Sequence, residues 1–330
     1  MFQILASLFI LLNPAIGFFA PSQTPIQNTP KEELSFADLE DYKLPISENA
    51  FWASQLAPSY PIRNWSISDP EITAKIALVF ETTRQKILWQ KDGLREPRPI
   101  ASLTKLMTAL VVMENYKLDD IFKISKEAVE TPGEMGDLVV GEELTIKNLL
   151  YALLIESSND AAVAIAEGIN NKVLNSSRNN GTHSNNNTSV NFVDLMNQKV
   201  KVLGLADTNF TDPSGLDPGN ISSAWDLNDL MQEVLKYPIL QEITQTSTIN
   251  FQSVDGKFNH YLTSTDKLLG KLPEIIAGKT GYTEEAGNCM ILAWRAPNDQ
   301  GIIISIIMDS QDRMAESEAL LQWTKEAFLW

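Results

Sequence analysis

A serine and a lysine lie three residues apart in the stretch PIASLTKLMTALVV, residues 99–112. Side chains at this spacing share one face of a helix, so the amine of Lys105 can reach the hydroxyl of Ser102. A serine hydroxyl becomes an effective nucleophile when a neighbouring base accepts its proton, and a neutral lysine can be that base. Burial would lower the pKa of Lys105, and so would a second cation, for which Lys279 is the candidate. The spacing indicates nucleophilic catalysis, but a capping serine on a core helix also fits it.

Two further polar clusters supply groups that such a nucleophile needs. Ser157 and Asn159 lie in a turn between two apolar segments, where a hydroxyl can relay a proton and an amide can bind a substrate amide. Lys279, Thr280 and Gly281 would place a cation and a hydroxyl beside a substrate, and the glycine would let its backbone approach closely. Each cluster alone also fits a helix break or a polar turn. All three motifs in this order are strong evidence for one hydrolytic site.

The composition excludes several other kinds of function. The 330 residues carry 42 acidic and 26 basic side chains, and the net charge of −16 argues against a nucleic-acid partner. One cysteine, Cys289, excludes a disulfide within the chain, and two histidines, His183 and His260, leave too few ligands for a typical zinc site. We therefore expect no metal and no cofactor. Cys289 is expected to be a buried packing residue, and neither histidine is assigned a catalytic role.

The first 70 residues differ from the rest of the chain. Residues 1–20 carry no charged side chain and contain an apolar core of signal-peptide length, followed by a small-x-small cleavage pattern. Uncleaved, the same residues could form an N-terminal membrane anchor. Residues 21–70 hold seven of the sixteen prolines and are typical of an extended linker. We expect an exported protein of the periplasm or another extracytoplasmic part of the cell envelope.

Hydrophobic patterning predicts the elements that position the polar clusters. Four segments are predicted to be β-strands, the first two forming a hairpin: 74–81, 85–92, 289–296 and 301–309. Five segments are predicted to be helices: 99–112, 145–155 (capped by Thr145), 161–169, 192–205 and 313–329. The Asn-rich stretch 175–189 is expected to be a polar surface loop. Strands at both ends with helices between them predict an α+β domain over residues 71–330.

The three motifs and their surroundings resemble the serine-type D-alanyl-D-alanine carboxypeptidases, the low-molecular-weight penicillin-binding proteins. The similarity includes ASLTKLMTAL (101–110), NLLYALLIESSNDAAVAIAE (148–167) and GKTGYTEEAGNCMILA (278–293), and it covers roughly residues 70–330. It implies a β-lactamase/transpeptidase-like fold, in which an antiparallel sheet is flanked by helices and joined to a mostly helical lobe. The site between them would bind peptidoglycan stem peptides, with β-lactam antibiotics as inhibitors.

The resemblance also implies a catalytic role for each matching residue. Ser102 would be the acylated nucleophile and Lys105 its base. Ser157 and Asn159 would form the second wall of the cleft. Ser158 replaces the glycine that usually separates these two residues, and we expect little consequence because its backbone need only permit the turn.

A third wall is implied to bind the substrate. It would consist of Lys279, Thr280, Gly281 and Tyr282. The backbone N–H groups of Ser102 and Tyr282 would form an oxyanion hole. Arg313 precedes Trp323 by ten residues, the spacing at which the family places an arginine that helps bind the substrate's terminal carboxylate. A surface arginine at a helix start also fits this position.

Four functions are compatible with a fold of this kind. The expected one is an exported D,D-carboxypeptidase that removes the terminal D-alanine of stem peptides through an acyl-enzyme. A D,D-endopeptidase would use the same residues on crosslinked peptides, and the absence of a second domain resembles some endopeptidases of the family. A class A-like β-lactamase would need a Glu-x-x-Leu-Asn pattern, which we do not find. A non-catalytic wall-binding scaffold is disfavoured because no motif residue is missing.

Overall fold

The computed structural model describes residues 61–133, 137–179 and 191–330, which belong to one compact unit, Pro58–Trp330. The predicted signal peptide or anchor and most of the predicted linker lie outside the described residues. Among the residues that are described, no helix is long and apolar enough to span a membrane.

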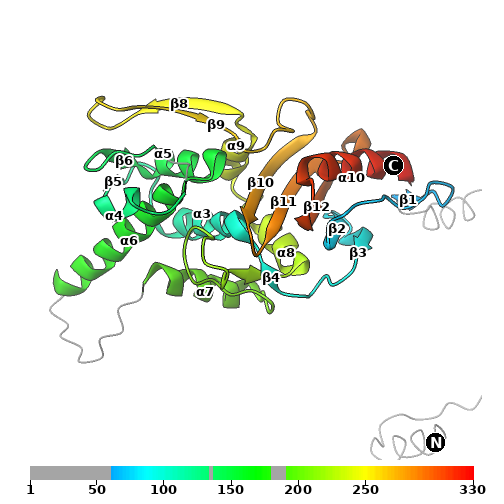
Figure 1. The fold of residues 1–330 in the computed structure, drawn as a ribbon, viewed down its shortest axis with the longest axis horizontal. Helices are drawn as coiled ribbons and strands as arrows, with labels where there is room; N and C mark the ends of the chain where they lie inside the picture. The colour runs from blue at the N-terminus through cyan, green and yellow to red at the C-terminus, as the bar shows by residue number, and fades with distance from the viewer. Residues whose placement is uncertain (1–60, 134–136, 180–190) are drawn as a thin grey trace, which may run out of the picture. The chain divides into compact units, whose positions relative to one another are not determined.

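A five-stranded antiparallel sheet forms the centre of the unit (Figure 1). In spatial order its strands are β10 (Ile275–Thr283), β11 (Gly287–Arg295), β12 (Ile302–Ser310), β2 (Ile76–Glu81) and β3 (Lys86–Lys91). β2 pairs with β12, so that Phe80 lies opposite Ile304. The sheet thus joins the two ends of the domain, which confirms the predicted hairpin and both predicted C-terminal strands.

The sheet is covered on both faces, because its central strands are apolar at consecutive positions. All six residues of β2 are buried, which is expected for a strand between two layers. On one face Val79 and Trp294 pack in a core with Leu320 of α10 (Arg313–Ala327). On the other face Leu78 and Ile306 belong to the larger core that continues into the helical lobe. The predicted α+β class and the flanked antiparallel sheet are confirmed.

The helical lobe surrounds one central helix. α3 (Thr104–Asn115) is buried at every position from Thr104 to Val112. Two helices contact it, α7 (Phe192–Leu203) and α8 (Ala224–Val234). The other helices of the lobe are α4 (Lys126–Val129), α5 (Ile146–Tyr151), α6 (Asn159–Asn179) and α9 (Pro238–Gln245). A helix buried on all sides has no polar face, so the lysine on α3 must find its partners inside the protein.

Four short antiparallel pairs complete the fold. They are β1 (Ile62–Arg63) with β13 (Phe328–Leu329), β4 (Arg98–Pro99) with β7 (Ile221–Ser222), β5 (Ile121–Lys123) with β6 (Glu143–Thr145), and β8 (Thr248–Gln252) with β9 (Asn259–Thr263). The first pair places residues 62 and 63, which the sequence assigns to the linker, against the last strand of the chain. The final helix also ends two residues earlier than predicted, because Phe328 begins β13.

Several helices in the lobe differ from their predicted extents. The helix predicted over 99–112 begins only at Thr104 and ends at Asn115, because Pro99 belongs to β4 and residues 101–103 form a separate 3-10 turn. α6 continues to Asn179, so the first five residues of the Asn-rich stretch are helical, and most of the remainder lies outside the described residues. The segment predicted as a helix over 145–155 is α5 followed by the π-helical turn η3 (Ala152–Glu156). Its predicted cap is confirmed, since Thr145 Oγ1 accepts a hydrogen bond of 3.2 Å from the Asn148 N–H.

Candidate active site

Ser102 lies in a single 3-10 turn, η2 (Ala101–Leu103), directly before α3. Its hydroxyl does not cap α3, whose N-cap residue is Leu103, and no side-chain cap bond is formed there. Ala101 has a φ of +48°, a left-handed conformation that is costly for a residue with a Cβ. The tight turn therefore leaves the Ser102 hydroxyl available for a partner other than the helix backbone.

That partner is Lys105, whose Nζ lies 2.8 Å from Ser102 Oγ. The same amine contacts the side-chain oxygen of Asn159 at 2.8 Å and the carbonyl oxygen of Ser214 at 2.6 Å. Its side chain is fully buried, and burial lowers the pKa of Lys105 to about 7, while Asp212 acts in the opposite direction. Near neutral pH a substantial fraction of this amine is therefore unprotonated.

The three contacts determine which way the neutral amine must point. Asn159 Nδ2 donates to the Pro132 carbonyl at 2.9 Å, which fixes the amide so that its oxygen faces Lys105. The oxygens of Asn159 and Ser214 can only accept hydrogen bonds. A neutral amine has two N–H groups for them, so its lone pair points at the Ser102 hydroxyl. The geometry is that of a base about to accept the serine proton.

The second cluster contacts both lysines, since Asn159 accepts from Lys105 and Ser157 accepts from Lys279. Ser157 ends the π-helical turn with a φ of +68°, and its Oγ accepts a hydrogen bond of 2.8 Å from Lys279 Nζ. Lys279 Nζ also donates to its neighbour's carbonyl, that of Thr280, at 2.9 Å. Burial lowers the pKa of Lys279 well below the usual value, and the charges of Lys105 and Arg313 add to this effect. Burial is the main cause at both lysines, and the repulsion between them adds to the pKa shift of Lys279 only, so the expected lowering of the Lys105 pKa by Lys279 is not seen.

Ser158 caps α6, because its Oγ accepts a hydrogen bond of 3.0 Å from the Ala161 N–H. The left-handed residue is Ser157, so Ser158 does not need the freedom of a glycine. This arrangement leaves Asn159 free to turn its amide toward Lys105.

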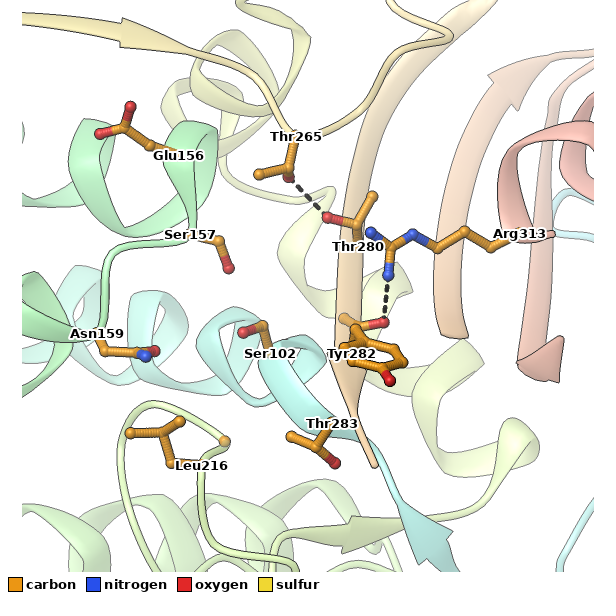
Figure 2. Close-up of a pocket in the computed structure, with 12 residues that line it drawn as sticks. Ser102, Glu156, Ser157, Asn159, Leu216, Thr265, Thr280, Tyr282, Thr283 and Arg313 are labelled. Carbon is orange, nitrogen blue, oxygen red and sulfur yellow. Dashed lines mark hydrogen bonds between the residues drawn. The ribbon is translucent and has the colours of Figure 1, made fainter. Parts of the chain in front are cut away.

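β10 forms the third wall, at the edge of the sheet. Thr280 Oγ1 lies 2.6 Å from the hydroxyl of Thr265, and Arg313 Nη1 donates to the Gly281 carbonyl at 2.6 Å (Figure 2). Gly281 packs against η2, because a Cβ there would lie 3.0 Å from the Ile100 carbonyl oxygen and 3.1 Å from the Ser102 nitrogen. Its small size thus brings the strand close to the nucleophile, a role beyond the expected close approach of the substrate backbone.

All nine predicted site residues meet around one pocket of about 180 Å³. Seven of them line it: Ser102, Ser157, Asn159, Thr280, Gly281, Tyr282 and Arg313. The other two, Lys105 and Lys279, lie buried behind their hydroxyl partners. In Figure 2 the hydroxyls of Ser102 and Ser157 face the space between the helical lobe and β10.

Sequence reasoning missed the loop that closes the pocket from below. Asp212 accepts hydrogen bonds from the N–H groups of Ser214, Gly215 and Asp217, which fold residues 212–217 into a tight turn. These bonds hold the pKa of Asp212 below its usual range despite its partial burial. The Ser214 carbonyl thereby reaches Lys105. The run Asp-Pro-Ser-Gly-Leu-Asp is a recognisable turn signal, but it does not reveal that the turn faces the lysine.

Gly215 should be indispensable to this arrangement. It has a φ of +90°, and a Cβ would overlap the backbone carbonyl of Ala101 beside the nucleophile. We expect Gly215→Ala to lower the free energy of unfolding by about 4 kcal/mol, because backbone strain and a clash with rigid backbone add together. Gly204→Ala is the matched control: its φ is +71° with nothing within 4 Å, so only about 1 kcal/mol should be lost. Urea unfolding of both variants measures the difference, and equal losses would contradict the close packing.

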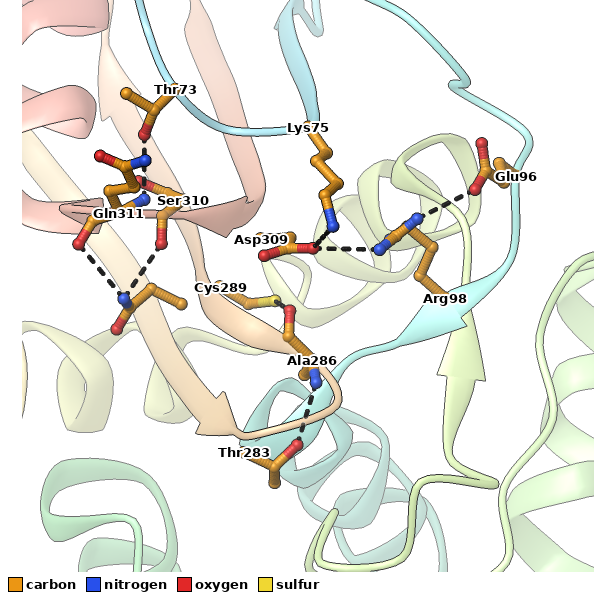
Figure 3. Close-up of polar contacts among 11 residues, drawn as sticks. Thr73, Lys75, Glu96, Arg98, Thr283, Ala286, Cys289, Asp309, Ser310 and Gln311 are labelled. Carbon is orange, nitrogen blue, oxygen red and sulfur yellow. Dashed lines mark hydrogen bonds and ion pairs between the residues drawn. The ribbon is translucent and has the colours of Figure 1, made fainter.

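Lys75, Arg98 and Asp309 form a charged cluster at the end of β12 (Figure 3). Asp309 receives ion pairs of 2.6 Å from Lys75 and 3.0 Å from Arg98, so the segment before the nucleophile is tied to the end of β12. Cys289 lies beside this group, and its Sγ contacts the Ala286 carbonyl at 3.5 Å. Burial raises the pKa of this thiol to about 11, so it stays protonated. Cys289 is therefore a buried packing residue, as predicted.

Comparison with known proteins shows which family the chain belongs to. Residues 63–312 match the model of the D-alanyl-D-alanine carboxypeptidase family of serine peptidases. The chain belongs to this family. The match begins at the first strand and includes all three motifs, and it ends one residue before Arg313.

The chain matches a different share of the length of each relative. The chain is 34% identical over 238 residues to the D-alanyl-D-alanine carboxypeptidase DacF of Bacillus subtilis, matching 70% of this chain but 56% of that relative. It is 30% identical to a D-alanyl-D-alanine endopeptidase of Pseudomonas aeruginosa, matching 77% of each. Among solved structures, the Streptomyces K15 DD-transpeptidase superposes with a TM-score of 0.67 at 25% identity, covering 78% of this chain and 99% of that one.

Proposed function

We propose that this protein is a serine D,D-carboxypeptidase of the cell envelope that removes the terminal D-alanine of peptidoglycan stem peptides. The observation that supports this most is the contact between Ser102 and a fully buried Lys105 whose pKa is lowered to about 7. Membership of the carboxypeptidase family supplies the substrate class. No metal and no cofactor are required by the chemistry proposed below.

In the proposed acylation, Ser102 Oγ attacks the carbonyl carbon of the penultimate D-alanine while Lys105 accepts the hydroxyl proton. The backbone N–H groups of Ser102 and Tyr282 would stabilise the developing oxyanion. The bond to the terminal D-alanine then breaks, and a proton passes to the departing amine. Ser157 is placed to relay that proton, because its hydroxyl is hydrogen-bonded to Lys279.

In the proposed deacylation, water attacks the ester on Ser102 with Lys105 again as the base. The released stem peptide is one alanine shorter. Thr280 and Arg313 line the pocket and would bind the terminal carboxylate of the substrate, and Lys279 would contribute to this binding from behind Ser157. β-Lactams would acylate the same serine and act as inhibitors.

Endopeptidase activity on crosslinked peptides is the second candidate. The chain matches 77% of the Pseudomonas aeruginosa protein, which is named an endopeptidase. The catalytic residues would be the same. The difference would lie in which amine leaves, a single D-alanine or the side chain of a second stem peptide.

A defined mixture of substrates separates the two activities. The protein, expressed from residue 21, is incubated with purified pentapeptide monomers and crosslinked muropeptide dimers, and the masses are followed by liquid chromatography. We expect monomers to lose one alanine and dimers to persist. Conversion of dimers to monomers would establish the endopeptidase instead. If folded protein changes neither substrate, a non-catalytic wall-binding scaffold becomes the better account.

Export is also part of the proposal. An envelope substrate requires the site to reach the periplasm or another extracytoplasmic space. The uncharged, apolar residues 1–20 would direct that export, as a cleaved signal or as an N-terminal tether. A role in cell shape would follow from trimming stem peptides that otherwise become crosslinked.

A further inference from the structure

The exposed face of the β8–β9 hairpin has an unusual composition for this chain. Side chains alternate along the two strands, so that three cross-strand pairs point to solvent. They are Thr248 with Thr263, Asn250 with Tyr261, and Gln252 with Asn259. All six are polar and uncharged, in a protein with a net charge of −16. Such a face is not built to attract or repel ions.

A hollow of about 440 Å³ lies on this hairpin. Its lining consists of Asn250, Phe251, Gln252, Asn259, His260 and Tyr261. The Tyr261 side chain is 69% exposed, a large aromatic surface in water. In the part of the chain that the structure describes, the Asn250 amide and the Tyr261 hydroxyl have no hydrogen-bond partner. Gln252 Nε2 donates to Asn259 Oδ1 at 2.8 Å, which orients both amides across the strands.

The other face of the hairpin is held rigidly. His260 Nε2 lies 2.8 Å from a buried Glu142 oxygen, and its ring stacks on Phe251 with centroids 5.1 Å apart. Near the tip, the Val254 N–H donates to the Glu143 carbonyl at 2.8 Å. A rigid base means that the exposed amides are positioned before a ligand arrives, so binding costs little ordering.

The hairpin leads directly into the candidate active site. Its base pair is Thr248 with Thr263, and Thr265, two residues further on, lines the catalytic pocket and contacts Thr280. The Thr265 N–H also donates to the Ile155 carbonyl at 3.1 Å, beside the turn that carries Ser157. Figure 1 shows β8 and β9 beside α5, next to the strand β10. A long ligand on the hairpin would therefore run toward the pocket.

We propose that this face, defined by Asn250, Gln252, Asn259 and Tyr261, binds the glycan strand that carries the stem peptides. Amide side chains both donate to and accept from hydroxyl and acetamide groups, as a neutral glycan of β-1,4-linked N-acetylated hexosamines requires. The exposed ring of Tyr261 offers an apolar surface for the C–H face of a sugar. The choice of this glycan rests on the proposed function. A bound strand would hold the enzyme on the wall while the pocket acts on its peptides.

The test measures binding without catalysis. Soluble oligomers of β-1,4-linked N-acetylglucosamine, which are neutral, are titrated by calorimetry into the protein expressed from residue 21. An α-linked glucan, which lacks acetamide groups, serves as the control ligand. We expect binding of the N-acetylglucosamine oligomers only, weakened at least about tenfold in the double variant Asn250→Ala/Tyr261→Ala. Val202→Ala on α7, also highly exposed, should leave the affinity unchanged.

Each remaining outcome overturns the proposal. These are no binding of the N-acetylglucosamine oligomers, equal binding of the glucan, or equal affinity in the double variant. Penicillin labelling of the double variant should equal that of the wild type, which shows that it is folded. Failure of the proposed function is distinguishable, because labelling would then be absent from the wild type while glycan binding still depended on Tyr261.

Discussion

Replacing Ser102 by alanine is expected to abolish acylation by penicillin and to reduce peptide hydrolysis by at least about 10⁴-fold. The reason is chemical: the covalent intermediate cannot form without the hydroxyl. The variant should fold normally, because removing the Oγ atom from a turn that does not use it as a cap costs little stability. Labelling with a fluorescent penicillin, followed by gel electrophoresis, measures the effect.

The control for this variant is Ser157→Ala. Ser157 lies in the same pocket, but we assign it a proton relay, so labelling should be slowed and not lost. A second control, Ser66→Ala, removes an exposed hydroxyl from the N-terminal loop and should change nothing. Complete loss in Ser157→Ala with labelling retained in Ser102→Ala would mean that the nucleophile has been wrongly assigned.

The acylation rate should rise with pH through about 7 and then level off, because Lys105 acts as a base only when neutral. A base with a lowered pKa loses its proton as the pH rises through that value, so the active fraction grows above it and falls below it. Lys105→Met removes the lone pair while retaining an apolar side chain in the buried site. We expect acylation to slow by about 10²–10⁴-fold and its rise near pH 7 to disappear. Stopped-flow acylation from pH 5 to 9 measures both effects.

Another titrating group could mimic this profile, and Asp160 is the one to exclude. Burial raises the pKa of its carboxyl to about 6, and it follows Asn159 in the chain. Asp160→Asn should retain the rise near pH 7. If the rise vanishes in Asp160→Asn and persists in Lys105→Met, the lysine is not the base.

The sequence was sufficient to predict the strands and the helix start that depend on local patterning. Alternating and continuous apolar runs predicted β2, β3, β11 and β12, and the Thr145 cap marked the start of α5. Strands at both ends of the chain predicted the α+β class, and the pairing of β2 with β12 shows that these strands join in one sheet. These features depend on periodicity and capping, which act over a few residues.

Other features depend on contacts between distant segments and could not be read locally. The amino-acid sequence of β1 does not indicate that it pairs with β13, some 265 residues later. The contact between the Ser214 carbonyl and Lys105 joins a turn to a helix more than 100 residues away. The π-helical turn before Ser157 needs tertiary packing to prefer it over an ordinary helix. The three motifs predicted which residues belong to one site, and the structure shows which of their atoms are in contact.

The most direct test of the central claim is to locate the covalent adduct. The protein is incubated with benzylpenicillin, digested, and its peptides are analysed by tandem mass spectrometry. The account predicts one penicilloyl group per molecule, on Ser102, in the wild type and none in Ser102→Ala. An adduct on Ser157 or another residue, or no adduct on folded protein, would contradict the claim that Ser102 is a nucleophile activated by Lys105.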